Sequence, residues 1–156
     1  MKILLEPIGY VTSSRKKIED DNWDAEQAFI ELEEGVFTHE ALHGVEEFSH
    51  VEVIFYMNQV SEDKIQRGSR HPRNRKDWPS VGIFAQRGKN RPNRIGSTIC
   101  QVQRVENTRL YLSGLDAIDG TPVLDIKPWV LEFGPRGEVK QPAWMTKLME
   151  SYWEES

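Results

Sequence analysis

Cysteines, helical patterns and long hydrophobic runs are scarce in this sequence of 156 residues. Because Cys100 is the single cysteine, no disulfide can form within the chain. Its apolar surroundings, TICQVQRV, predict a buried side chain, with a reactive thiol as the alternative. No stretch of about 18 consecutive apolar residues occurs, and the opening MKILLEPIGYV has no cleavage site. We therefore expect a cytoplasmic protein that does not span a membrane, with a single domain over residues 1–156.

Glycine-rich nucleotide signatures are missing as well. Neither G-x-G-x-x-G nor G-x-x-x-x-G-K-[ST] occurs in the sequence. An adenosine cofactor would therefore have to bind without the crossover of a Rossmann fold. The scarcity of helical patterns agrees with this expectation.

Acidic residues outnumber basic ones, but the two kinds are segregated along the chain. Residues 1–63 carry 4 Lys/Arg and 15 Asp/Glu, whereas residues 64–94 carry 10 Lys/Arg and one acidic residue, Asp77. Such a basic cluster attracts phosphates even in a protein of net charge −5, because the local field decides the contact. The alternative is a charged loop that complements the acidic first third, within the chain or across a dimer.

Short β-rich runs bounded by Gly, Pro, Asn or Asp dominate the pattern and predict a mainly β barrel or sandwich. Asn107 and Thr108 separate two of these runs, as in a tight antiparallel hairpin. Ser61–Gln66 is a candidate short helix with Ser61 as N-cap, and Ala143–Trp153 is a candidate amphipathic helix with Met145, Leu148, Met149 and Tyr152 on one face. The seven expected strands are Ile8–Val11, Phe29–Leu32, Val51–Met57, Val81–Ala85, Ser97–Val105, Arg109–Leu115 and Val123–Ile126.

One segment, His39–His43, matches the zinc-hydrolase pattern H-E-x-x-H. In that pattern a rigid helix presents two histidines one turn apart. Here Gly35 and Gly44 flank the motif, and neither His50 nor His71 falls at a familiar spacing for a third ligand. A zinc hydrolase is therefore only a remote alternative, and we expect no metal site.

Two further motifs carry candidate binding chemistry. In Gly82–Gly96 an apolar strand enters a loop that contains arginines, asparagines and a proline. Guanidinium groups bind carboxylate or phosphate groups, and an asparagine side chain can hydrogen-bond a purine or a ribose. In Leu115–Pro128 three aspartates lie within ten residues, at a spacing unlike that of a calcium loop. A carboxylate there could face a sulfonium or a ribose; the alternative is turn chemistry with a pair between Asp125 and Lys127.

These runs together resemble the TsaA-like, or tRNA methyltransferase O-like, family. The resemblance implies a closed antiparallel β-barrel with short helices and a C-terminal helix, S-adenosylmethionine (AdoMet) as cofactor, and a homodimer whose subunits both border the site. It also implies a tRNA methyltransferase that acts on N6 of a threonylcarbamoyl-adenosine next to the anticodon. The segments that carry the resemblance are Pro7–Val11, Gly44–His50 before VEVIFYM, His71–Arg73, Gly82–Gly96 and Leu115–Trp129.

The resemblance also assigns residues. An N-terminal loop contributes to the family's site and usually reads Pro-Arg-Gln, whereas this chain has Asp21–Asp24 there, and Arg94 stands where the family generally has proline. The implied cofactor contacts are His71, Pro72, Arg87, Ser97, Ile118, Asp119, Gly120 and Thr121, with Asn22 and Trp23 at the place of the N-terminal loop. The candidate RNA contacts are Arg73, Arg75, Lys76, Lys89, Arg91 and Asn93.

Methyl transfer from a sulfonium is an in-line displacement that needs chiefly alignment of the two reactants. We expect Arg87 or Arg91 to hold an anionic group, and Phe84 or Trp23 to offer a stacking face for adenine. The sequence identifies no general base, since His50, just before a strand, is better explained as a satisfied buried imidazole. The competing interpretation is a non-catalytic barrel that binds RNA or a protein partner.

Overall fold

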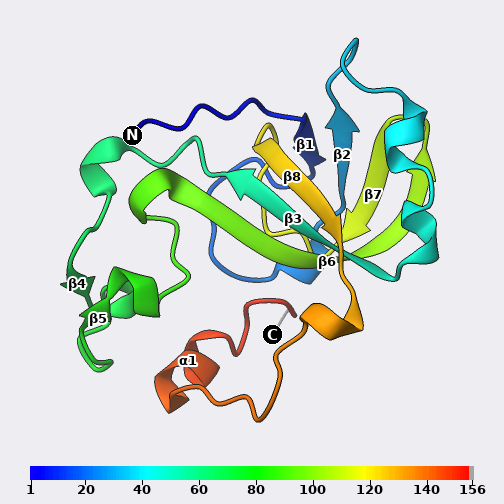
Figure 1. Cartoon of the computed structure of the whole chain (residues 1–156). Helices are drawn as coiled ribbons and strands as arrows, with labels where there is room; N and C mark the ends of the chain where they lie inside the picture. Colours follow the sequence, from blue (N-terminus) through cyan, green and yellow to red (C-terminus); the bar gives the residue numbers. More distant parts are fainter. Residues whose placement is uncertain (155–156) are drawn as a thin grey trace.

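The computed structural model describes residues 1–154 and contains a closed six-stranded antiparallel barrel (Figure 1). This confirms the predicted mainly β fold and decides for a barrel over a sandwich. Around the barrel the order is β1 (Gly9–Ser13), β2 (Ala28–Leu32), β7 (Arg109–Ser113), β6 (Ile95–Glu106), β3 (His50–Tyr56) and β8 (Pro122–Pro128), which pairs again with β1.

The barrel core comes from strands whose side chains alternate between inside and outside. In β3 the inward residues Val51, Val53 and Phe55 are buried, while their neighbours are partly exposed. Cys100 on β6 is fully buried, as predicted, and this burial raises the pKa of its thiol well above the ordinary value.

β6 and β7 form the expected hairpin, which turns at Asn107 with a φ of 52°. Asparagine tolerates this left-handed backbone better than most residues. The register between the two strands shifts between Val102 and Arg104, so the long β6 bends around the barrel.

The predicted strand Val81–Ala85 is wrong in its second half. Only β5 (Val81–Gly82) is extended; it pairs with β4 (Ser69–Arg70) in a small sheet outside the barrel, and the chain then turns into a 3₁₀ helix, Ile83–Ala85. The side-chain amide of Gln86 explains the turn, because it donates to the carbonyl oxygens of Arg70 and Val81 at 3.1 and 3.0 Å.

The helices are short, and none within residues 1–154 has the length and apolar character needed to cross a bilayer. The predicted tail helix exists but ends early, since α1 spans Ala143–Leu148 and residues 149–153 turn back toward the barrel. The predicted helix at Ser61 is a single 3₁₀ turn, Glu62–Lys64, with Ser61 as N-cap. The other 3₁₀ helices are Trp23–Ala25, His39–Leu42, Val45–Glu47, Pro72–Asn74, Pro92–Arg94 and Leu131–Phe133.

Candidate functional site

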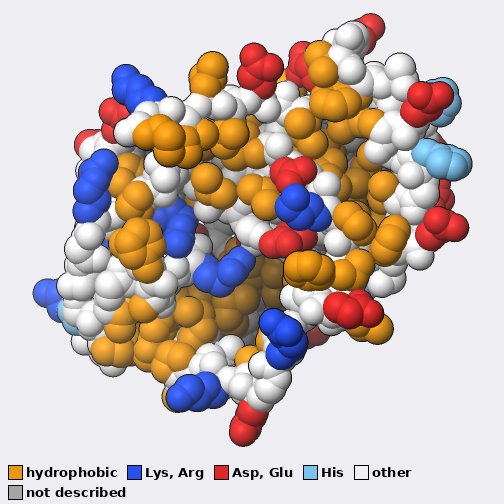
Figure 2. Space-filling view, viewed as in Figure 1, with side chains coloured by type: hydrophobic (Ala, Val, Ile, Leu, Met, Phe, Trp, Pro, Cys, Tyr) orange, Lys and Arg blue, Asp and Glu red, His pale blue; other side chains and the backbone are white. Residues whose placement is uncertain are grey.

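A cavity of about 710 Å³ lies between the barrel, the β4–β5 sheet and the tail that carries α1. This volume falls in the range of small-molecule sites, about 300–1,000 Å³. Figure 2 shows the hollow with a mainly hydrophobic lining and Lys/Arg side chains at its rim. Its wall consists of residues of β3 and β6 together with residues 18–20, 23, 57–60, 70, 72–73, 83, 86–91, 116–118, 121, 144–145, 148–149 and 152–153.

Arg15 holds the N-terminal loop in place. Its buried guanidinium donates to Glu26 at 3.0 Å and to the carbonyl oxygens of Asp21 and Asn22 at 2.9 and 3.0 Å. It also lies 4.0 Å from the ring centroid of Trp23, a buried residue of the cavity wall. One buried cation therefore shapes this loop from the inside.

The tail closes the cavity beside this N-terminal loop. Backbone N–H groups of residues 22, 23 and 24 donate to the carbonyl oxygens of residues 151, 152 and 153 at 3.0, 3.0 and 2.8 Å. The four residues predicted on one face, Met145, Leu148, Met149 and Tyr152, all lie in the cavity wall. The wall is thus completed by a segment that follows the barrel in sequence.

Two carboxylates in the wall accept hydrogen bonds from hydroxyl groups. Glu52 accepts from Ser97 at 2.7 Å. Asp116 accepts from Thr98 on one oxygen and from Tyr152 on the other. Burial and the Asp116 carboxylate raise the pKa of Tyr152 well above its ordinary value, so the phenol stays neutral and acts as a donor.

In the arginine-rich loop within Gly82–Gly96, arginine side chains donate hydrogen bonds to backbone carbonyl oxygens. Arg87 donates to the carbonyl oxygen of Ser97 at 2.6 Å, and Arg91 donates to that of Gln86 at 2.7 Å. Arg94 has a φ of 51°, which the fixed ring of proline cannot adopt. Its guanidinium donates to the carbonyl oxygen of Val60 at 2.6 Å, and this hydrogen bond helps to hold the left-handed turn at Arg94 in place.

The predicted cofactor residues separate into two groups. Trp23, Pro72, Arg87, Ser97, Ile118 and Thr121 line the cavity, whereas Asn22, His71, Asp119 and Gly120 lie outside its wall. Asp119 accepts from the Ser13 N–H at 3.0 Å and pairs with Lys16 at 2.8 Å, and the Lys16 ammonium, followed by that N–H, lowers the pKa of the carboxyl. His71 contacts the carbonyl oxygen of Trp78 at 2.7 Å.

The predicted RNA contacts are divided in the same way. Arg73, Lys89 and Arg91 lie in the wall, whereas Arg75, Lys76 and Asn93 lie outside it. Three of these cations have acidic partners: Arg73 with Asp21 at 2.8 Å, Lys89 with Asp20 at 3.2 Å, and Arg75 with Asp77 at 2.5 Å. The basic segment thus complements part of the acidic N-terminal third within the chain.

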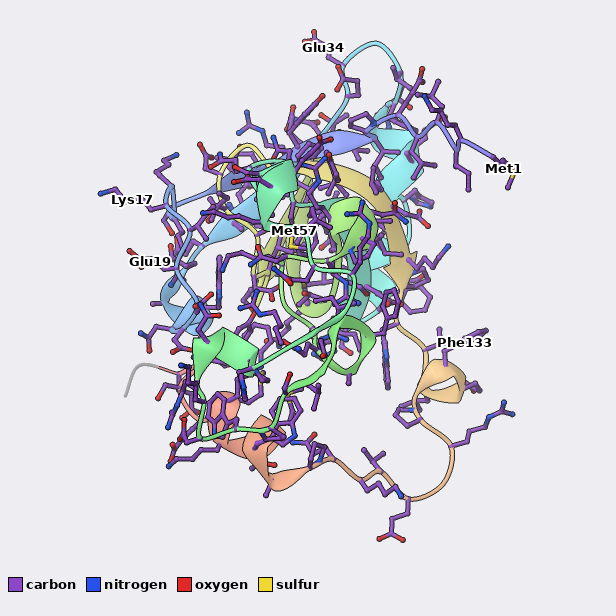
Figure 3. All side chains as sticks on the ribbon, turned by 90° about the vertical axis from the view of Figure 1, so that its left-hand side faces the viewer. Met1, Lys17, Glu19, Glu34, Met57 and Phe133 are labelled. Atoms are coloured by element: carbon purple, nitrogen blue, oxygen red, sulfur yellow. The ribbon has the colours of Figure 1, made fainter. Side chains whose placement is uncertain are left out.

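The remaining candidates lie away from the cavity. Asp125 pairs with Lys127 at 2.8 Å, as the turn alternative predicted. The exposed Phe84 is not part of the wall, and His50 contacts the Ser49 hydroxyl at 2.7 Å. Figure 3 shows Glu19 on the N-terminal loop, which borders the cavity, and Phe133 projecting from the connection that leads to α1.

The H-E-x-x-H segment does not form the helix that a zinc site of this pattern requires. Residues His39–Leu42 make one 3₁₀ turn and His43 is already extended, with a ψ of 127°. Within residues 1–154, no group of three or more His, Cys, Asp or Glu side chains gathers as metal ligands would.

Residue-level prediction missed Glu52, Asp116, Tyr152 and Arg70. Asp116 was visible as part of the aspartate-rich turn, and Tyr152 as part of an amphipathic face. Neither signal indicates that these two residues, 36 positions apart, form a hydrogen bond.

The chemistry of the wall fits AdoMet. Carboxylates in an otherwise apolar lining suit a sulfonium cation, and arginines at the rim suit a carboxylate. The buried Nε of Arg70, a wall residue, has no hydrogen-bond partner among the described residues. This donor is available to a polar ligand group.

Comparison with known proteins gives relatives over most of the chain. Residues 15–134 match a family model described as the tRNA-methyltransferase O N-terminal domain. RcsF of Pseudomonas aeruginosa is 40% identical over 131 residues, which are 81% of this chain and 54% of that protein. The tRNA (adenine(37)-N6)-methyltransferase of Mus musculus is 36% identical over 138 residues, 84% of this chain and 32% of that protein. The chain thus spans about half of the first relative and a third of the second.

Another relative is close to this chain in length. The S-adenosyl-L-methionine-binding protein of Archaeoglobus fulgidus is 33% identical over 132 residues, which are 81% of this chain and 89% of that protein. A crystal structure of TrmO from P. aeruginosa superimposes with a TM-score of 0.73 at 31% identity, covering 92% of this chain and 62% of the other.

Proposed function

Since this chain belongs to the tRNA-methyltransferase O N-terminal domain family, we propose that it is an AdoMet-dependent methyltransferase that acts on N6 of an adenine nucleoside in tRNA. The observation that carries the proposal is the cavity, with Glu52 and Asp116 in its wall and Arg87 and Arg91 at its basic side. In this proposal the nucleoside is a threonylcarbamoyl-adenosine next to the anticodon, and the protein acts in the cytoplasm.

The wall residues have separate tasks in this proposal. AdoMet supplies an electrophilic methyl group on a positively charged sulfur. Glu52 provides negative charge toward that cation, which favours binding more than the transfer step because the charge disperses during the reaction. Arg87 holds an anionic group of the ligand, and the apolar tail residues keep water out of the site.

Incubation with labelled AdoMet tests the activity. Bulk tRNA from a strain that lacks the gene is the acceptor, and the digested nucleosides are analysed for a new methylated species. We expect label in one modified adenosine. Label in another nucleoside would contradict the proposed substrate, and the absence of any transfer by a protein that binds AdoMet would contradict the proposed activity.

The role of Arg87 has its own test. Arg87→Ala should weaken AdoMet binding at least tenfold, which corresponds to about 1.4 kcal/mol in calorimetry. Arg136→Ala is the matched control, because Arg136 is exposed and lies outside the cavity wall. An unchanged affinity in Arg87→Ala would remove this guanidinium from the binding site.

A second candidate function is AdoMet binding without methyl transfer. It is favoured by the A. fulgidus relative, which is similar in length and is named only for binding. The labelling experiment separates the two functions, because a binding protein retains AdoMet and leaves every nucleoside unlabelled.

We also propose a homodimer whose interface borders the cavity. Ile95 and Ile99 are exposed although they line the cavity, and Phe84 is exposed on the adjoining loop. Exposed apolar clusters of this kind favour association with a protein surface. Ile99→Lys should therefore produce a monomer in light scattering, whereas Leu131→Lys, at an exposed position outside the wall, should remain dimeric; a monomeric wild type would contradict the proposal.

A further inference from the structure

We propose that Asp116 is the catalytic residue that accepts the proton from the nucleophilic N–H of the substrate. The Tyr152 hydroxyl marks the position on the carboxylate that this N–H takes. The inference rests on the proposed function and adds the general base that the sequence does not identify.

Asp116 is held in a fixed place. It follows β7 after Gly114, which has a φ of 75°, and its neighbours Leu115 and Ala117 are both buried. These anchors on either side direct the intervening side chain into the cavity wall, where Thr98 donates to one carboxylate oxygen. A proton acceptor needs this kind of positioning, because proton transfer requires hydrogen-bond distance.

The other wall carboxylates have competing partners or no burial. Asp20 is paired with Lys89, and Glu19 is exposed. Glu52 lies opposite the Lys127 cation in the β3–β8 register and accepts a hydrogen bond from Ser97. Among residues 1–154, Asp116 forms no salt bridge, and the cavity wall contains no histidine.

Tyr152 shows what the second oxygen of Asp116 can accept. Its hydroxyl, on the tail, donates to this oxygen, and the raised pKa of the phenol keeps it a donor. A substrate N–H is also a donor and can make the same hydrogen bond once Tyr152 is displaced. The tail that carries Tyr152 is joined to the loop at residues 22–24 through backbone hydrogen bonds, so the side chain can turn without loss of those bonds.

The transfer step balances with this single acceptor. The nitrogen lone pair forms the new bond to the methyl carbon, and the carbon–sulfur bond breaks with its electron pair retained by sulfur. The nitrogen becomes acidic as this bond forms, so a carboxylate is a sufficient base, and the proton moves to Asp116. A sulfonium and a carboxylate thereby become a neutral thioether and a neutral carboxylic acid.

The test compares Asp116→Asn with Asp125→Asn, an aspartate of the same motif that pairs with Lys127 outside the cavity wall. Asp116→Asn should lower the single-turnover rate of methyl transfer to tRNA at least about 100-fold, while the AdoMet dissociation constant in calorimetry stays within about threefold. Asp125→Asn should keep the wild-type rate.

A measurement without cofactor checks the contact itself. In an ultraviolet titration the Tyr152 phenol should ionise above the ordinary range of a tyrosine, because its pKa is raised, and comparison with Tyr152→Phe identifies it. Asp116→Asn should move this ionisation to lower pH, because the carboxylate no longer opposes the phenolate; an unmoved transition would overturn the contact.

The outcomes are distinguishable. If the wild type transfers methyl groups and Asp116→Asn is within about threefold of it, the role of Asp116 is overturned while the proposed function stands. Loss of AdoMet binding in Asp116→Asn, or an equal loss of rate in Asp125→Asn, also overturns it. If the wild type binds AdoMet and transfers nothing, the proposed function fails and the inference fails with it.

Discussion

Replacement of Arg15 by alanine removes the cation around which the N-terminal loop folds. The side chain of Arg15 is 6% exposed and that of its partner Glu26 is 17% exposed. The substitution removes the Arg15 donor from one carboxylate oxygen of Glu26 and from the carbonyl oxygens of Asp21 and Asn22, and uncovers one face of Trp23.

Removal of one partner from a buried ion pair costs about 3–5 kcal/mol. Because the total stability of a domain is about 5–15 kcal/mol, this is a large fraction of it. For a chain of this length each kcal/mol lowers the melting temperature by about 2–4 °C, so Arg15→Ala should melt about 6–20 °C below the wild type.

Urea unfolding followed by tryptophan fluorescence measures the change. The matched control is Arg104→Ala, since Arg104 also pairs with a glutamate, Glu106, at 3.0 Å and lies 3.7 Å from an aromatic ring centroid, that of Tyr111, but is 53% exposed. This control should leave the unfolding midpoint unchanged, because exposed pairs contribute little. A loss below about 1 kcal/mol in Arg15→Ala would refute the assigned role of the buried cation.

Three further predictions concern pH, packing and thiol chemistry. The hydrogen bond from Ser14, followed by Arg15, lowers the pKa of Glu26. The ionised Glu26 carboxylate therefore contributes its full stabilisation above the ordinary pKa of 4.5 and loses it as the pH falls through the lower pKa of the folded state. Urea midpoints that do not decrease below pH 4.5 would contradict this. Gly96→Ala should cost about 1–3 kcal/mol, measured as a lower melting temperature, because an added Cβ would lie 2.4 Å from the buried ring of Phe55; an unchanged melting temperature would contradict the tight packing. Cys100 should react with Ellman's reagent only on unfolding, because it is fully buried and its thiol pKa is raised, and rapid reaction of the native protein would show that the thiol is accessible.

Much of the barrel could be predicted because strand patterns are local. Val51, Val53 and Phe55 alternate with more polar neighbours, and the buried position of Cys100 followed from its apolar run. The motifs also indicated the family, which the comparisons confirm. Closure of the barrel followed from that resemblance, since β1 and β8 are more than 100 residues apart in sequence.

Contacts between distant segments account for what the sequence did not reveal. Val81–Ala85 has the composition of a strand, but the Gln86 amide stabilises a turn instead. The pair between Arg73 and Asp21 joins residues 52 positions apart, and the contact between Asp116 and Tyr152 depends on a tail that folds back after α1. Side-chain type indicates that such groups need partners, but it does not indicate which partners they find.

The left-handed backbone at Arg94 restricts how this loop can change during evolution. A proline at position 94 would need a negative φ, so it could enter only together with a different path for the whole Pro92–Arg94 turn. The guanidinium also connects this turn to the carbonyl oxygen of Val60. Loops with arginine and loops with proline at this position therefore need different backbone conformations. Replacement of Arg94 alone by proline would place a residue with a fixed negative φ where this turn has a positive one.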